Sequence, residues 1–295
     1  MCGQPDHPGG MRERGEFMIL VTGATGNVGS ELVAQLANAG QPLKALVRKH
    51  DSTTFPSGVT PVVGDLDDPE SMAGALENVR AMYLMPGYSQ MSTLLDVAEA
   101  AGVEHVVLLS NGSAGIAHTG NVIARSMADS ERAVRESGLA WTMLRARAFM
   151  SNTLRWLPQL AVGDVVRVQF PRVALAAIDP ADIAAVAARA LTGMDLTGEV
   201  LDLTGPEALY PADQVAILAE TLGRPLVCRE LTDEETRAEL AATVPAQYAA
   251  AFTDFYIDGS LDESVVYPTV ATVTGRAPRT FTDWATAHAA SFTRR

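Results

Sequence analysis

Short apolar runs alternate with longer amphipathic stretches along the first half of the chain. The apolar runs predict strands, and the stretches between them repeat apolar positions at helical spacing. Strands that alternate with helices favour a parallel sheet covered on both faces, an α/β fold. The predicted strands are 19–21, 43–47, 60–63, 80–84, 105–109 and 141–144, and the predicted helices are 28–38, 69–77, 91–101 and 122–137.

The strict alternation fades after residue 151. Helical patterns follow at 179–191, 211–222, 232–256 and 282–292, with short strands at 200–204 and 226–230. We expect part of this half to extend the sheet and part to build a small α/β lobe over the ligand. The predicted organisation is a disordered leader at 1–17, rich in Gly, Pro and charge, a nucleotide-binding core at 18–155, and a sheet extension with a substrate lobe at 156–295, interleaved with the core as one domain.

The composition and net charge limit the classes of partner that we expect. The chain has 295 residues, of which 47% are hydrophobic, and carries a formal net charge of −13. The electrostatic field of so negative a protein repels nucleic acid and anionic membranes, so we expect neither as a partner. No apolar run has the length of about 18 residues that a membrane span needs.

Cysteine and histidine are sparse. Cys2 and Cys228 lie far apart, and the histidines have no metal-ligand spacing, so we predict neither a disulfide framework nor a metal site. A reducing cytoplasm is the expected location. Arginine outnumbers lysine, which occurs only at positions 44 and 49, and alanine is abundant, a composition typical of a GC-rich bacterial genome.

The segment Leu20-Val-Thr-Gly-Ala-Thr-Gly-Asn-Val-Gly29 joins the first predicted strand to the first predicted helix. Its glycines allow a tight turn and a close approach of the backbone to a bound group. Backbone N–H groups and the positive end of a helix at such a turn bind a pyrophosphate. We therefore predict a nucleotide cofactor held by five residues of the turn, Gly23, Thr25, Gly26, Asn27 and Val28.

The second and third strands end on charged residues. Arg48 and Lys49 stand where an NAD-preferring fold has an acidic residue, and two cations there favour the 2′-phosphate of NADP(H). A solvated basic pair is the alternative, and the nearby Asp51 leaves NAD(H) as the less favoured cofactor. Asp65, followed by Leu66, is placed to accept from the adenine amino group or to cap the next turn.

The loops after the fourth and fifth strands complete the predicted cofactor site. Met85 and Pro86 should run beneath the nicotinamide ribose. Ser110 and Asn111 end the fifth strand, where Ser110 is placed to polarise a substrate, although serine is also common at strand ends.

Five side chains are candidates for the substrate pocket. His118 is a candidate proton donor, with a solvated loop histidine as the alternative. Tyr88 is a second weak catalytic candidate, placed to cover the nicotinamide or bind substrate, or to pack. Phe149, Asn152 and Trp156 follow the sixth strand and are predicted to line the pocket, although Phe149 and Trp156 are equally core candidates.

Seven motifs follow one another along the chain: Thr22–Gly29, Leu46–Arg48, Gly64–Leu66, Ser137–Arg145, Ile178–Ala184, Leu203–Pro206 and Val273–Phe281. In sequence and order they resemble the NmrA-like family of atypical short-chain dehydrogenases/reductases. The resemblance implies a Rossmann-type sheet, a small C-terminal substrate lobe and, usually, NADP(H). That family contains quinone and azo-dye reductases, tailoring reductases of secondary metabolism, and regulators that bind the cofactor without using it.

One departure bears on mechanism. Ordinary short-chain reductases use Tyr-x-x-x-Lys, in which the tyrosine delivers a proton. The predicted helix 122–137 contains neither residue type. Hydride transfer survives this loss when the acceptor needs little acid help, as with a quinone.

The sequence therefore favours an NADPH-dependent oxidoreductase that reduces a quinone-like or aromatic polyketide-like small molecule. Two alternatives stay open: a redox-sensing regulator that binds NADP(H) without catalysis, and a non-redox tailoring enzyme that keeps the cofactor as a scaffold. The expected partner is an aromatic small-molecule substrate, with a homodimer as a possible assembly.

Overall fold

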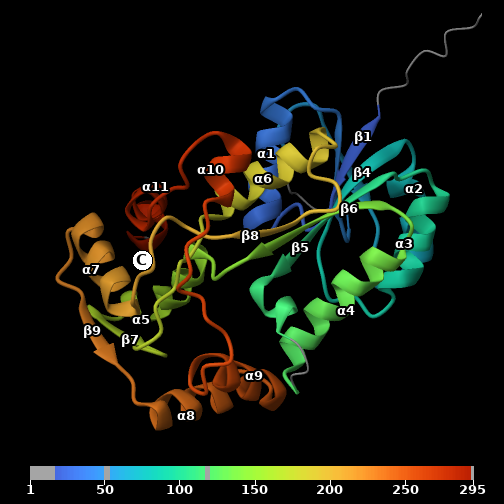
Figure 1. Ribbon diagram of the computed structural model, residues 1–295. Coiled ribbons are helices and arrows are strands. Elements are labelled where there is room, and N and C mark those ends of the chain that lie inside the picture. The colour runs from blue at the N-terminus through green and yellow to red at the C-terminus, as the bar shows by residue number, and fades with distance from the viewer. Residues whose placement is uncertain (1–16, 50–53, 117–119, 294–295) are drawn as a thin grey trace, which may run out of the picture.

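Seven parallel strands form the main sheet, in the order β3-β2-β1-β4-β5-β6-β8. The computed structural model describes residues 17–49, 54–116 and 120–293. The predicted parallel sheet is confirmed, and Figure 1 shows helices on both of its faces. The strands are β1 (Met18–Val21), β2 (Leu43–Val47), β3 (Val59–Val63), β4 (Val79–Leu84), β5 (His105–Asn111), β6 (Ala140–Ala146) and β8 (Val200–Leu203).

Two apolar layers hold the helices on this sheet, because alternate strand residues point to opposite faces. Leu32 of α1 (Asn27–Asn38), Ile183 of α6 (Pro180–Thr192) and Val270 of α10 (Thr269–Thr274) are buried in one layer. The opposite layer buries residues of η1, α2, α3 and α4, whose bounds are Pro69–Met72, Ala73–Leu76, Met91–Ala100 and Val122–Glu136.

The strand order reverses beside β1, which pairs with β2 on one side and β4 on the other. Ligands of such sheets bind beyond the carboxyl ends of the strands at this reversal. The topology therefore directs attention to the loops that follow β1, β4 and β5.

A smaller lobe surrounds the two-stranded parallel sheet of β7 (Val165–Val168) and β9 (Val227–Glu230). Trp284 is almost fully buried in its core and stacks on Phe281, with ring centroids 5.6 Å apart; Trp156 belongs to the same core. The lobe lies beside the main sheet, with α8 and α9 at its lower edge (Figure 1). Its helical segments are η3 (Met150–Trp156), α5 (Leu157–Leu160), α7 (Pro211–Leu222), α8 (Asp233–Thr243), α9 (Ala246–Tyr256) and α11 (Phe281–Thr293).

The chain enters and leaves this lobe more than once. After η3, α5 and β7 it returns to the main sheet as α6 and β8, and α7 to α9 then belong to the lobe again. The segment before α11 is held to α6, because Arg276 pairs with Asp182 at 2.9 Å and the Arg279 backbone N–H donates to the same carboxylate. The lobe is thus interleaved with the sheet rather than appended to it.

Three elements differ from the sequence prediction. The strand β7 and the helix α10 were not predicted, since β7 is only four residues long and half exposed. Residues 232–256 form two helices rather than one, because Pro245 lacks a backbone N–H and holds the preceding Val244 in an extended conformation. No helix among the described residues is long and apolar enough to cross a membrane.

Candidate cofactor and substrate site

The turn between β1 and α1 is shaped by glycine. Gly23 has a φ of +59°, a left-handed conformation that side chains disfavour. A Cβ on Gly29 would lie 2.0 Å from the Gly23 carbonyl oxygen. The first turn of α1 therefore packs directly on the backbone of the loop, and position 29 admits no side chain.

The N-terminus of α1 presents free backbone donors. Gly26 is the N-cap, no side chain caps the helix, and its first turn contains no acidic residue. Among the described residues, the N–H groups of Asn27 and Val28 have no hydrogen-bond acceptor. Free N–H groups and the positive helix end attract an anion, so this turn fits the pyrophosphate of a dinucleotide.

Arg48 and Lys49 lie at the carboxyl end of β2, and both are exposed. Within the described residues, neither is paired with a carboxylate. Asp65 accepts a hydrogen bond from the Asp67 backbone N–H at 3.0 Å, while the N-cap of η1 is Asp68. The Asp65 side chain thus stabilises its own turn, whereas the expected N-cap role falls to Asp68, and the contact with adenine stays a prediction.

The structure separates Tyr88 from the other substrate candidates. Burial raises the pKa of Tyr88, the carboxylates of Asp67 and Asp65 raise it further, and Arg48 lowers it. Tyr88 therefore lies with the charged residues that follow β2 and β3, because the loop after β4 turns at Gly87, where φ is +92°. The prediction that it covers the nicotinamide finds no support in this placement.

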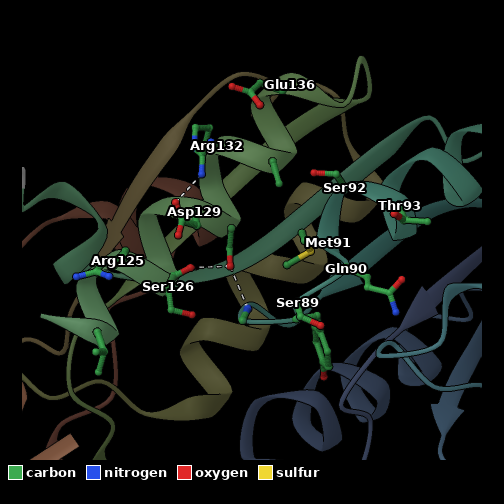
Figure 2. A pocket seen from close by; sticks show the side chains of 15 residues that line it. Ser89, Gln90, Met91, Ser92, Thr93, Arg125, Ser126, Asp129, Arg132 and Glu136 are labelled. Carbon is green, nitrogen blue, oxygen red and sulfur yellow. Dashed lines mark hydrogen bonds and ion pairs between the residues drawn. The ribbon is translucent and has the colours of Figure 1, made fainter. Parts of the chain in front are cut away.

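A polar cavity of about 570 Å³ adjoins Tyr88, between the loop after β4 and the outer side of α4 (Figure 2). The Gly87 backbone N–H donates to the Ser130 hydroxyl at 3.0 Å, which fixes the loop against α4. Arg132 and Asp129 form an ion pair of 2.6 Å on the same helix. Arg125 and Glu136 also line the cavity, and neither forms an ion pair with another described residue.

Met85 connects this loop to the glycine turn. Its backbone N–H donates to the Thr22 hydroxyl at 3.1 Å, and its side chain lies against Gly23. Pro86 follows and is half-buried. Met85 thus lies beside the glycine turn, and the position of this loop beneath the nicotinamide ribose stays a prediction.

A buried carboxylate occupies the end of β5. The Ser110 hydroxyl donates to Glu131 at 2.7 Å, and Arg145 donates to both Glu131 oxygens at 2.8 and 2.7 Å. Burial would raise the pKa of Glu131, but the hydrogen bonds from Arg145, Ser110 and Arg135 outweigh it and hold that pKa below its usual range. The Ser110 hydroxyl therefore donates within the protein, and its role toward the cofactor or a substrate stays a prediction.

Asn111 has a local role as well. Its side-chain oxygen accepts from the Ser113 backbone N–H at 2.9 Å and from the Ser113 hydroxyl at 2.6 Å, which caps η2 (Gly112–Gly115). Its backbone remains at the carboxyl end of β5, beside the Ser110 position. His118 lies outside the described residues.

A second cavity, of about 670 Å³, lies within the lobe, lined by residues of η3, α7, α8 and α9. Phe149, Asn152 and Trp156 all line it, so the structure brings these three predicted residues together. Trp156 is also part of the lobe core, so the pocket and core interpretations both describe it. Ser151 lines the same cavity and accepts from the Asn27 side-chain amide at 3.2 Å, which places the cavity next to the glycine turn.

The sequence analysis missed several residues of this cavity. Phe170 has a φ of +53°, unusual for a bulky residue, and its ring lies 4.9 Å from that of Tyr256. Burial raises the pKa of Tyr256, as does the charge of Glu263, so its hydroxyl stays protonated and can donate. Arg155 directly precedes Trp156, which was predicted to line the pocket, and that position was the available sequence signal for it. No sequence signal pointed to Gln214 or Tyr256.

A family profile described as NAD(P)H-binding matches residues 23–193. The chain is 40% identical over 282 residues to the (4-alkanoyl-5-oxo-2,5-dihydrofuran-3-yl)methyl phosphate reductase of Streptomyces griseus, covering 93% of this chain and 99% of that protein. It is 35% identical over 284 residues to the NAD(P)H azoreductase of Xenophilus azovorans, with the same coverage of 93% and 99%.

A solved structure shares the fold. The NADPH-dependent quinone oxidoreductase of Escherichia coli, complexed with NADPH, superposes with a TM-score of 0.75 at 22% identity. The match covers 92% of this chain and 99% of that one. At this identity the likeness concerns the fold.

Proposed function

The chain belongs to the NAD(P)H-binding family, within the NmrA-like atypical short-chain reductases, and from that membership we propose that it is an NADPH-dependent reductase of electron-poor conjugated small molecules. Quinones and acylated unsaturated lactones are the acceptor classes. One observation supports this most: an anion-binding helix end and a cavity of about 670 Å³ adjoin each other, joined by the Asn27–Ser151 hydrogen bond.

The residues of the chain divide the work. The N–H groups at the start of α1 hold the pyrophosphate, and Arg48 with Lys49 hold the 2′-phosphate. NADPH, when bound, supplies a hydride. The apolar walls of the cavity, including Phe149, orient the acceptor and exclude water, and positioning of this kind contributes several kcal/mol to rate acceleration. The balance is acceptor plus NADPH plus H⁺ giving reduced acceptor plus NADP⁺.

The absent Tyr-x-x-x-Lys pair selects the acceptor. Helix α4 has no tyrosine or lysine, and the buried Lys44 donates to the Glu77 carbonyl at 2.6 Å, so it cannot assist. Acceptors whose reduced form is a stabilised anion take their proton afterwards from water. The related proteins are named for a quinone, an azo compound and an acylated dihydrofuranone, which are acceptors of this kind.

Steady-state oxidation of NADPH tests the proposal. The protein is mixed with a benzoquinone, an azo dye and a 3-acyl unsaturated lactone, each against a simple ketone. We expect turnover with conjugated acceptors and none with the ketone, since the ketone needs an acid. Tight NADPH binding without turnover of any conjugated acceptor would overturn the proposal.

That negative result would favour the regulator. The observation behind this second candidate is the Ser110–Glu131 hydrogen bond, which removes a further group that could polarise a substrate. The regulator predicts a partner protein that binds in one cofactor redox state only, which a pull-down with NADPH and with NADP⁺ distinguishes.

A further inference from the structure

The charges in the cavity beside the glycine turn do not balance. Two arginines and one glutamate line it. Arg167 pairs with Glu239, and Gln169 also donates to that carboxylate. Arg155 is left without an acidic partner: no carboxylate in 17–49, 54–116 or 120–293 forms an ion pair with it. The cavity therefore carries a net positive charge in a protein whose net charge is −13.

The Arg155 side chain is available to a ligand. It is exposed rather than buried, and its guanidinium lies 6.0 Å from the centroid of the Trp156 ring. A guanidinium stays charged in proteins, and an arginine without a protein counter-ion is free to pair with an anionic ligand.

A second side chain points to the same ligand. Gln214, on the first turn of α7, is only 4% exposed and lines the cavity. Its side-chain amide makes no hydrogen bond to another described residue, although buried amides are nearly always paired. Tyr256 lines the same cavity, and in the described part of the chain no acceptor takes its hydroxyl proton. Donors from η3, α7 and α9 thus line one cavity, and no described residue accepts a hydrogen bond from these three side chains.

We propose that Arg155, Gln214 and Tyr256 form a subsite for the phosphate ester of the substrate. Phosphate suits this set, since it accepts from a guanidinium, an amide and a hydroxyl together. The apolar residues Phe149, Phe170 and Leu240 line the remainder of the cavity and suit an alkyl or ring portion. The subsite rests on the proposed reductase function and narrows its substrates to phosphorylated ones. The phosphate named in the Streptomyces griseus relative is consistent with it.

Matched substrates and variants test the subsite. The kcat/KM of the full-length protein is measured for a 3-acyl-lactone methyl phosphate, for its dephosphorylated alcohol and for a neutral quinone. Arg155→Gln should reduce kcat/KM for the phosphate about ten- to hundredfold, chiefly through KM, since a hydrogen bond to a charged group has that magnitude. The alcohol and the quinone should change less than about twofold. Arg237→Gln is the control, because Arg237 is an exposed arginine of α8 that does not line the cavity.

Binding gives a readout independent of turnover. Benzyl phosphate and benzyl alcohol are titrated against the intrinsic tryptophan fluorescence, with and without NADPH. The unmodified protein should prefer benzyl phosphate, and Arg155→Gln should abolish that preference while its melting temperature and its NADPH affinity stay unchanged.

The outcomes are distinct. Equal binding of the two benzyl compounds by the unmodified protein would overturn the subsite and leave reduction of the neutral quinone intact. Loss of NADPH affinity in Arg155→Gln would assign the arginine to a phosphate of the cofactor and also overturn it. Phosphate-selective binding without turnover of any acceptor would support the subsite and refute the reductase.

Discussion

The two halves of the site are built in different ways. The proposed cofactor half is local: ten consecutive residues supply a glycine turn and a helix end whose backbone N–H groups are free to bind a ligand. The substrate half is assembled from η3, α7, α8 and α9, and its chemistry lies in side chains. Backbone groups do not change with most substitutions, whereas side chains do. One fold can therefore keep its cofactor while its substrate changes.

The first test concerns the buried Glu131 carboxylate, on whose contacts we expect both halves of the site to depend. Glu131 is 1% exposed and ties α4 to the ends of β5 and β6. Glu131→Ala leaves Arg145 without its partner, and breaking a buried pair costs about 3–5 kcal/mol of unfolding free energy. Urea denaturation measures the loss. As a control, Glu104→Ala removes an exposed ion pair with Arg80 and should cost about 1 kcal/mol or less of unfolding free energy. An equal loss in both variants would contradict the stabilising role of Glu131.

The stability of the protein at acidic pH should depend on the same carboxylate, Glu131. Because the folded-state pKa of Glu131 is depressed, its stabilisation is present above the ordinary glutamate pKa of 4.5 and is lost as pH falls through the folded-state value. Melting temperatures measured across this acidic range should fall in the unmodified protein. The decline should be shallower in Glu131→Gln, and parallel curves would refute the assignment.

The second test changes the cofactor half alone, at its glycine turn. In Gly29→Val the new Cβ would meet the Gly23 carbonyl oxygen at 2.0 Å, so loop and helix must separate. Overpacking of this kind costs about 1–3 kcal/mol, and NADPH binding should be lost with it. Melting temperature and NADPH fluorescence measure the two effects. At Gly74 a Cβ meets nothing within 4 Å, so Gly74→Ala should leave both unchanged.

The third test concerns the side-chain element of the cofactor half. Arg48→Glu should weaken NADPH binding by about 1.5–3 kcal/mol, or roughly ten- to hundredfold, and spare NADH, which lacks the 2′-phosphate. Titration with both cofactors measures the change. Arg237→Glu on α8 makes the same change of charge elsewhere. Equal affinity of the unmodified protein for NADPH and NADH would refute the role of Arg48.

The smallest effect is expected outside both halves. A chain that begins at Met18 should melt within about one or two degrees of the full chain, since surface changes contribute under about 0.5 kcal/mol. It loses one described contact, the Arg80 guanidinium 4.6 Å from the Phe17 ring centroid. A larger drop in calorimetry would show that residues 1–17 pack on the fold.

The same contrast explains what the sequence predicts well. Strands such as Leu43–Val47 are buried apolar runs, and the glycine turn is a contiguous motif, so both can be read from neighbouring residues. Phe149, Asn152 and Trp156 were also accessible, because they follow a predicted strand end. In each case the information lies within one short segment.

What the sequence did not reveal depends on residues far apart in the chain. The Asn27–Ser151 hydrogen bond joins positions separated by 124 residues. Gln214 and Tyr256 reach the cavity only because α7 and α9 fold back over η3. For Ser110 both interpretations stayed open for the same reason: its partner Glu131 lies on a different element, and a local pattern does not show that pairing.

The interleaved lobe also sets an order of events during synthesis. Its core joins Trp156 to Phe281 and Trp284, so the apolar surface of η3 stays uncovered until α11 has been made. The glycine turn, β1 and α1 leave the ribosome before η3 and can pair with β2 and β4 much earlier. A nascent chain interrupted before α11 would therefore hold a nearly complete sheet beside an uncovered apolar face, the kind of intermediate on which chaperones act.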